Sequence, residues 1–218
     1  MHKLSFCRPA GVVLRVLCLG AHSDDIEIGC GGTMLSLLES YHNVAVRWVV
    51  FSASEVRARE AQDSAAAFLE QAQEKEIVVK GYRDGFFPFL GAQIKDDFEA
   101  LKRDFNPDLV LTHYREDRHQ DHRLISDLTW NTFRNHLILE YEIPKFDGDL
   151  GCPNFFVPLE ESVCSKKVRN LIGSFKSQGQ KQWFDEQTFF AILRLRGMEA
   201  NSPTRFAEAF YCRKIVLG

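Results

Sequence analysis

Apolar and polar residues occur in alternating blocks along the chain, and these blocks predict strands and helices in turn. Residues 12–20 form a β-branched and Leu-rich run of strand length. Residues 44–51 form a nearly continuous apolar run, as expected for a strand that is covered on both faces. Residues 54–73 are instead rich in Ala, Glu and Gln, which is typical of a helix, with Ser54 at its N-cap. The pattern therefore predicts buried strands separated by amphipathic helices.

The alternation continues to residue 143. The predicted strands are 12–20, 44–51, 76–80, 109–112 and 137–143, and the predicted helices are 33–41, 54–73, 94–105 and 121–135. We interpret the glycine-rich residues 29–32 as part of the loop before the first helix. Repeated strand and helix alternation predicts a Rossmann-like, three-layer α/β fold with a mostly parallel, doubly wound sheet.

The pattern beyond residue 143 is less regular. It predicts a strand at 154–158, helices at 163–175 and 183–195, and a closing strand at 210–217. Neither a linker nor an internal repeat interrupts the sequence. We therefore predict a single domain over residues 1–218, with a core at about 12–143 and a C-terminal extension at about 144–218.

Composition and charge narrow the classes of function. Lys and Arg number 27 against 30 Asp and Glu, giving a net charge of −3, so the chain lacks the basic field expected of a nucleic-acid-binding protein. No apolar run approaches the roughly 20 residues that cross a bilayer. Six scattered cysteines without a CxxC pair favour a reducing, cytoplasmic location. We expect a small-molecule partner, no nucleic acid and no membrane, and we leave a homo-oligomer open.

Residues capable of metal binding and proton transfer follow two of the predicted strands. His22, Asp24 and Asp25 follow the first strand, and His119, Asp121 and His122 follow the fourth. Ligands of such sheets bind beyond the carboxyl ends of the strands, near the point where the strand order reverses. Two histidines and one carboxylate around a metal ion, with a position left for water, suit metal-assisted hydrolysis.

Each loop alone permits a simpler interpretation. His22 can be a structural loop histidine, Asp121 a helix N-cap and Arg57 a solvated helix residue. The glycines of residues 29–32 do not form the GxGxxG pattern of a dinucleotide site. Two other functions also remain open. A non-haem iron(II) oxygenase also uses two histidines and a carboxylate to hold its metal. A non-catalytic binding protein would instead bind a sugar or nucleotide without hydrolysing it.

Two motifs resemble those of a known family. Residues 21–33, AHSDDIEIGCGGT, resemble the AHPDDExxxGGT motif of the PIG-L/LmbE-like zinc-dependent N-acetylglucosaminyl deacetylases, and residues 119–122, HQDH, resemble their HPDH motif. Weaker similarity extends the resemblance over residues 14–216: Arg57 and Glu60 (RxxE), 175–178 (HxSQ), 196–197 (RG) and 206–210 (YAEAF). The chain departs from these motifs at Ser23, Ile26, Gln120 and Phe175.

The resemblance implies a role for each residue of the two loops. His22, Asp25 and His122 would bind Zn²⁺, although Fe²⁺, Co²⁺ or Mn²⁺ would also suit such ligands. Asp24 would be the general base, and His119 would stabilise the oxyanion of the tetrahedral intermediate. Arg57 would bind substrate, and Asp121 would support the His119 ring.

The implied activity is that of a zinc-dependent hydrolase that removes the acetyl group from an N-acetylated amino sugar conjugate, releasing acetate and a free amine. The group attached to the sugar is not predicted. The polar segment 142–149 is a candidate substrate-selecting loop, with ordinary turn chemistry as the competing view. We expect His113, which lies outside both motifs, to be structural.

Overall fold

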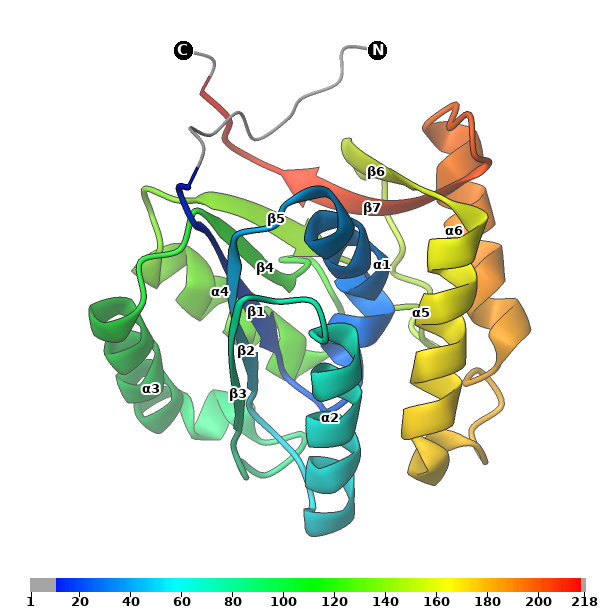
Figure 1. The fold of residues 1–218 in the computed structure, drawn as a ribbon. Coiled ribbons are helices and arrows are strands. Elements are labelled where there is room, and N and C mark those ends of the chain that lie inside the picture. The colour runs from blue at the N-terminus through cyan, green and yellow to red at the C-terminus, as the bar shows by residue number, and fades with distance from the viewer. Residues whose placement is uncertain (1–10, 217–218) are drawn as a thin grey trace.

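The computed structural model describes residues 11–216, which form a sheet flanked by helices (Figure 1). The strands are β1 (Leu14–Gly20), β2 (Val44–Val50), β3 (Glu74–Val79), β4 (Leu109–His113), β5 (Leu137–Tyr141), β6 (Phe155–Leu159) and β7 (Phe206–Cys212). The helices are α1 (Asp25–Ser40), α2 (Glu55–Phe68), α3 (Gly91–Asp104), α4 (Gln120–Thr132), α5 (Glu161–Ser174) and α6 (Glu186–Glu199). Short 3-10 turns lie at Phe87–Phe89 and Lys176–Gln178.

All seven strands belong to one sheet, in the order β3-β2-β1-β4-β5-β7-β6. The first five are parallel, and β7 runs antiparallel to both β5 and β6. The predicted α/β fold with a mostly parallel sheet is confirmed. The strand order reverses between β1 and β4, because the chain runs outward through β2 and β3 on one side and through β5 on the other.

Helices cover both faces of the sheet, as Figure 1 shows. Alternate residues of β1 point to opposite faces, because side chains alternate along a strand. Leu14, Val16 and Cys18 pack in the core with α1, α2, α5 and α6, whereas Leu17 and Leu19 pack in the core with α3 and α4. Burial of both faces explains why β1 is almost wholly apolar, with the exposed Arg15 as the exception.

The segment beyond residue 143 is integrated into this arrangement. It supplies β6 and β7 to the sheet, while α5 packs against α1 and α2. The predicted closing strand was placed too late: β7 spans Phe206–Cys212, and the last predicted position, 217, lies outside the described residues. Within residues 11–216, none of the helices combines the length and apolar character needed to cross a membrane.

The glycines of residues 29–32 lie inside α1, which corrects the prediction of a loop there. Helix α1 begins at Asp25, eight residues before the predicted start. A Cβ atom on Gly29 would lie 2.1 Å from the Tyr141 ring, and one on Gly32 would lie 2.5 Å from Leu159. These residues are glycines because α1 packs too closely against β5 and β6 for a side chain, and not because the backbone turns there.

We predict that Gly29→Ala destabilises the protein. The new methyl group overlaps the Tyr141 ring, whose hydroxyl donates a hydrogen bond to Leu19 O at 2.6 Å, so the ring cannot move freely. Overpacking of this kind costs about 1 to 3 kcal/mol of unfolding free energy. Equilibrium unfolding in urea measures the loss.

Gly173→Ala is the matched control, because a Cβ atom there meets no atom within 4 Å although Gly173 also lies in a helix. It should leave stability unchanged or raise it by up to about 1 kcal/mol. Equal stability of the two variants would contradict a packing role for Gly29.

Candidate active site

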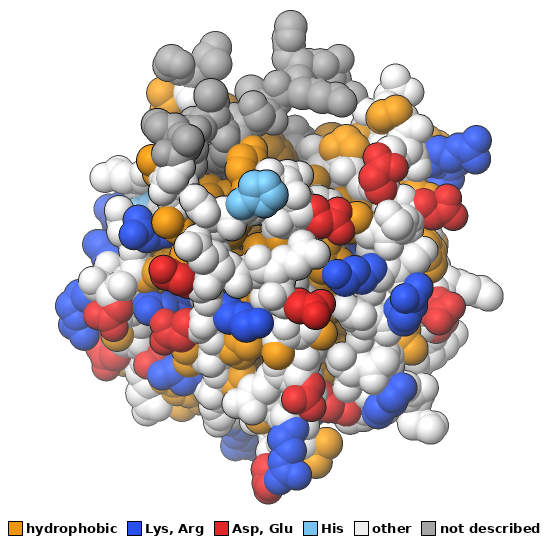
Figure 2. Space-filling model, viewed as in Figure 1, with side chains coloured by type: hydrophobic (Ala, Val, Ile, Leu, Met, Phe, Trp, Pro, Cys, Tyr) orange, Lys and Arg blue, Asp and Glu red, His pale blue; other side chains and the backbone are white. Residues whose placement is uncertain are grey.

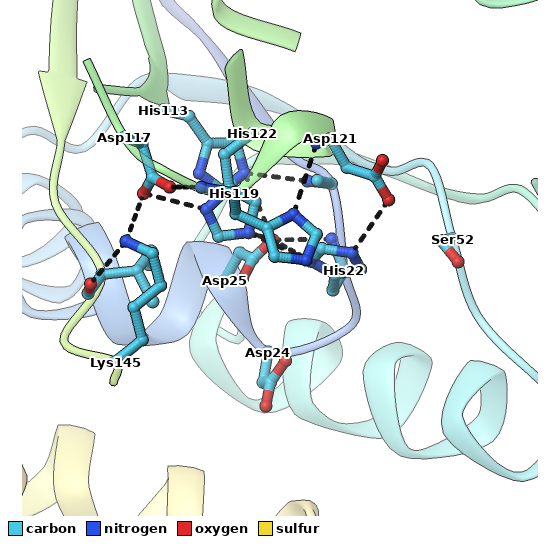
Figure 3. Close-up of polar contacts among 12 residues, drawn as sticks. His22, Asp24, Asp25, Ser52, His113, Asp117, His119, Asp121, His122 and Lys145 are labelled. Atoms are coloured by element: carbon cyan, nitrogen blue, oxygen red, sulfur yellow. Dashed lines mark hydrogen bonds and ion pairs between the residues drawn. The ribbon is translucent and has the colours of Figure 1, made fainter. Parts of the chain in front are cut away.

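The two predicted loops meet at one end of the β1 and β4 strands (Figure 3). His22 lies between β1 and α1, Asp25 is the first residue of α1, and His122 lies in the first turn of α4. All three side chains are buried. Because β1 and β4 are neighbouring parallel strands, residues about 100 positions apart in the sequence share one site.

Three ligand atoms converge there. His22 Nδ1 lies 3.1 Å from His122 Nε2 and 3.3 Å from Asp25 Oδ2, and His122 Nε2 lies 3.5 Å from the same oxygen. Zinc bonds of about 2.0 to 2.1 Å at tetrahedral angles separate ligand atoms by about 3.3 Å. The triangle therefore has the dimensions of three zinc ligands. Other possible sets overlap it: His22, His119 and His122; Asp25, His113 and His122; and His22, Asp84 and Asp121.

Carboxylates face the outer nitrogen of each histidine. His122 Nδ1 donates to Asp117 Oδ2 at 2.9 Å, which leaves its Nε2 lone pair directed into the triangle. His22 Nε2 lies 3.0 Å from Asp84 Oδ1 and 3.4 Å from Asp121 Oδ2. Carboxylates in this position orient metal-binding histidines and fix their tautomer.

The pKa shifts of His22 and Asp25 indicate a demand for positive charge beside the Asp25 carboxylate, whereas the shift of His122 does not. Burial disfavours protonation of His22, but Asp25 raises its pKa well above the usual value. Burial and the neighbouring His113 ring lower the pKa of His122 to about 3. Burial opposes ionisation of Asp25, yet the surrounding rings hold its pKa well below the usual range. A divalent cation satisfies the same demand through the same three atoms.

Asp24 lies beside this triangle in a different environment. Its buried carboxyl accepts a hydrogen bond from Arg57 Nη2 on α2 at 2.8 Å, and it points away from the histidines in Figure 3. Burial raises its pKa, the Arg57 guanidinium opposes that rise, and the Asp25 charge adds to it. Arg57, which was predicted to bind substrate, thus forms a hydrogen bond with the predicted base.

His119 is the N-cap of α4, and its ring lies against that of His22, with centroids 4.8 Å apart. Its Nδ1 accepts a hydrogen bond from the Asp121 N–H at 3.3 Å, so the neutral ring carries its proton on Nε2. Burial and the nearby His22 ring lower its pKa. His119 is therefore a neutral hydrogen-bond donor at the edge of the triangle.

Asp121 lies in the site but differs from the prediction in what it contacts. Its carboxylate accepts hydrogen bonds from the backbone N–H groups of Gly85 at 2.7 Å and Phe87 at 3.1 Å, and it faces His22. Only its backbone N–H meets the His119 ring. It therefore fixes the loop after β3 to α4, beside one of the predicted zinc ligands.

Three further residues complete the cluster and were not predicted. Asp117 holds His122, and Lys145 Nζ donates to Asp117 Oδ2 at 2.9 Å. His113, expected to be structural, stacks on His122 with ring centroids 4.0 Å apart and lies 3.2 Å from Asp25 Oδ2. The sequence offered one usable sign: Asp117 lies in the same polar loop as His119 and His122.

Comparison with known proteins gives a matching family and several similar folds. The PIG-L family, described as GlcNAc-PI de-N-acetylase, matches residues 17–133. Similar solved structures include a conserved protein from Thermus thermophilus, with a TM-score of 0.73, 19% identity, and coverage of 94% of this chain and 97% of that one. The N,N'-diacetylchitobiose deacetylase from Pyrococcus horikoshii matches with a TM-score of 0.66, 22% identity, and coverage of 91% and 83%.

A third structure shows how far this likeness reaches. The 4-carboxy-2-hydroxymuconate hydratase from Pseudomonas putida matches with a TM-score of 0.68, 17% identity, and coverage of 94% and 98%. Proteins named for two different reactions therefore share this fold. At these identities the structural likeness establishes the fold, and the reaction has to be argued from the site.

Glu27, which lies within the first motif, yields a prediction about stability. Its side chain is fully buried on α1, and burial raises its pKa to about 8, partly opposed by the Ser64 hydroxyl. Between its ordinary pKa of 4.5 and about 8, the folded protein binds a proton that the unfolded chain does not. Glu27 therefore makes stability fall as pH rises through this range, by up to about 1.4 kcal/mol per pH unit.

We expect Glu27→Gln, which resembles the protonated carboxyl, to remove this fall. In urea unfolding from pH 5 to 9, the free energy of unfolding of the variant should rise relative to that of the wild type up to about pH 8. Above that pH the difference between the two free energies should stay constant. Glu70→Gln, at an exposed position, is the control and should show no such trend. A pH-independent difference for Glu27→Gln would contradict the raised pKa.

Proposed function

The chain belongs to the PIG-L family, described by its GlcNAc-PI de-N-acetylase activity, and from this premise we propose that it is a zinc-dependent hydrolase of N-acetylated amino sugars. The products are acetate and a free amine. The observation that carries the proposal is the triangle of His22 Nδ1, Asp25 Oδ2 and His122 Nε2, whose edges measure 3.1 to 3.5 Å. Figure 2 shows one face of the molecule, on which basic and acidic side chains are interspersed.

These three residues would hold the metal ion. Two neutral imidazoles and one carboxylate are ligands that zinc prefers, and three protein ligands leave a position for water or substrate. When bound, the ion lowers the pKa of a water molecule toward neutrality and polarises the acetamide carbonyl. Fe²⁺, Co²⁺ and Mn²⁺ accept the same ligands, so the geometry does not select the metal.

Asp24 is the proposed general base. It neighbours Asp25 in the chain, but its carboxyl points away from the ligand triangle, so it is not one of the three ligands. To take a proton from the attacking water, the carboxyl has to come within hydrogen-bond reach of that water. Its burial raises its pKa toward the range in which a carboxylate works as a base near neutral pH. The Arg57 guanidinium, which donates to this carboxyl, opposes the rise in its pKa.

His119 is the proposed oxyanion donor. Its Nδ1 is engaged by the Asp121 N–H, so Nε2–H is the group available to substrate. The lowered pKa favours the neutral ring. A neutral imidazole stabilises the negative charge of the oxyanion by donating a hydrogen bond from Nε2–H. Departure of the amine then requires a proton, which protonated Asp24 can return.

The substrate class is supported by the comparisons rather than by a defined pocket. The family is described by a GlcNAc conjugate, and the P. horikoshii neighbour is named for N,N'-diacetylchitobiose. Arg57 offers further N–H groups to a sugar hydroxyl or an anionic substituent while it holds Asp24. We therefore propose a small-molecule N-acetyl amino sugar conjugate and leave its attached group open.

The direct test is acetate release by the zinc-loaded protein from a panel of N-acetylglucosamine conjugates and nucleotide-linked N-acetyl sugars. Asp24→Asn should lower kcat by at least about 100-fold while retaining zinc, because it removes the base and not a ligand. His122→Ala should lose both zinc and activity.

Each contrary result has its own meaning. Equal zinc loss in Asp24→Asn and His122→Ala would contradict the division between base and ligand. Zinc binding without acetate release from any substrate in the panel would favour a binding-only protein. Oxygen uptake that depends on a 2-oxo acid would favour an iron oxygenase.

Arg57→Leu separates two roles of one side chain. Because the guanidinium lowers the pKa of Asp24, its removal should move the acidic limb of the kcat/KM profile to higher pH. Arg59→Leu is the control, since Arg59 lies on the same helix, is exposed and pairs with Glu55. A rise in KM with an unmoved acidic limb would show that Arg57 serves substrate binding alone.

A further inference from the structure

Lys145 lies behind the proposed metal site, in the segment predicted to select substrate. Its ammonium group donates to Asp117 Oδ2 at 2.9 Å and to Asp149 Oδ2 at 2.5 Å, with Ile143 O at 3.4 Å. The side chain is only 12% exposed. A buried lysine with this set of partners is held in one place, so its positive charge has a fixed position relative to the site.

The same carboxylate oxygen serves Lys145 and His122. Asp117 Oδ2 accepts His122 Nδ1–H at 2.9 Å, while Asp117 Oδ1 accepts the His119 N–H at 2.7 Å. In Figure 3, Lys145 lies beside Asp117, Asp117 lies beside His122, and His122 lies near Asp25. The ammonium is thus separated from a proposed zinc ligand by one carboxylate.

The competition for this oxygen has an electronic consequence. A carboxylate that accepts from a metal-binding histidine makes the imidazole a stronger donor to the metal. An ammonium on the same oxygen draws its negative charge away, so less of that charge reaches the ring. His22, by contrast, faces the carboxylates of Asp84 and Asp121, the latter also bound by backbone N–H groups.

We propose that Lys145 is a positioning and tuning residue that limits electron donation through Asp117 and His122, and so keeps the bound cation strongly Lewis acidic at the expense of affinity. The proposal rests on the proposed function, because it assigns His122 as a ligand. It adds a residue that lies outside both sequence motifs and outside residues 17–133, the range of the family match.

The simpler alternative is that Lys145 only fixes its own loop. It joins Asp117 to Asp149, and Asp149 Oδ2 also accepts the Arg118 N–H at 2.7 Å. If fixation were the whole role, removal of either Lys145 or Asp149 would loosen the site and weaken metal binding alike. Tuning predicts the opposite sign for Lys145, because loss of a nearby positive charge favours a cation.

The test measures Zn²⁺ affinity of the full-length protein by competition with a chromophoric chelator, so no substrate is needed. Lys145→Met should bind Zn²⁺ about tenfold more tightly than wild type, and its kcat for acetate release should fall by a similar factor, with KM little changed. Lys145→Arg retains the charge and should restore wild-type affinity.

Three further variants make the result decisive. Lys145→Gln keeps an N–H donor without the charge and should also bind more tightly, which covers the case in which the methionine variant does not fold. Asp149→Asn should not tighten binding. Lys80→Met removes another lysine that is paired with a carboxylate, the Lys80–Asp97 pair at 3.0 Å beside α3, and should leave affinity unchanged.

Weaker Zn²⁺ binding in both Lys145→Met and Asp149→Asn would overturn the proposal in favour of loop fixation. Unchanged affinity in Lys145→Met and Lys145→Gln would overturn it as well. Tighter binding in a protein that releases no acetate would support the role of Lys145 and contradict the proposed function. A wild-type protein that binds no Zn²⁺ would overturn both.

Discussion

The parallel pairing of β1 with β4 is the constraint on which the candidate site depends. Val16 pairs with Leu109 and Cys18 with Leu111, so the chain leaves both strands at the same edge of the sheet. From there α1 packs on one face of the sheet and α4 on the other. Because the strand order reverses between β1 and β4, two helix N-termini and two loops lie together at this edge of the sheet.

The segment after the family match supports helix α1 of this site. Lys167 of α5 and Glu208 of β7 form a buried ion pair at 2.6 Å, and both side chains form hydrogen bonds with the backbone of α1. Glu208 accepts the N–H groups of Gly32 and Thr33, and Lys167 donates to Ile28 O. Buried charges are tolerated when every partner is supplied, and here the helix backbone supplies them. The C-terminal segment thereby holds the helix that begins with Asp25.

The sequence predicted the parts of the fold that local pattern determines. Continuous apolar runs located β1 and β2 to within two residues at either end, because strands buried on both faces admit few polar side chains. The start of α1 was missed because glycines usually indicate a turn, whereas Gly29 is required by the distance to Tyr141, a residue more than 100 positions away. A packing contact between residues so far apart in the sequence cannot be predicted from the pattern of neighbouring residues. The same distinction explains what was found of the site: His22, Asp25 and His122 lie in short motifs at the strand ends, whereas His113 has no local pattern, and Lys145 was noticed only as part of the polar segment 142–149. Their places in the cluster are recognised only from the contacts of Lys145 with Asp117 and of His113 with Asp25.

Asp24 and Asp25 show how one turn of backbone can give two identical side chains different chemistry. Asp24 is the N-cap of α1 and Asp25 its first residue, so the carboxyls diverge. Asp25 enters a group of imidazoles that lowers its pKa, while burial, partly opposed by the single guanidinium partner, raises that of Asp24. A metal ligand has to remain ionised, and a base has to exchange a proton. The position at which α1 begins therefore decides which aspartate can take which proposed role.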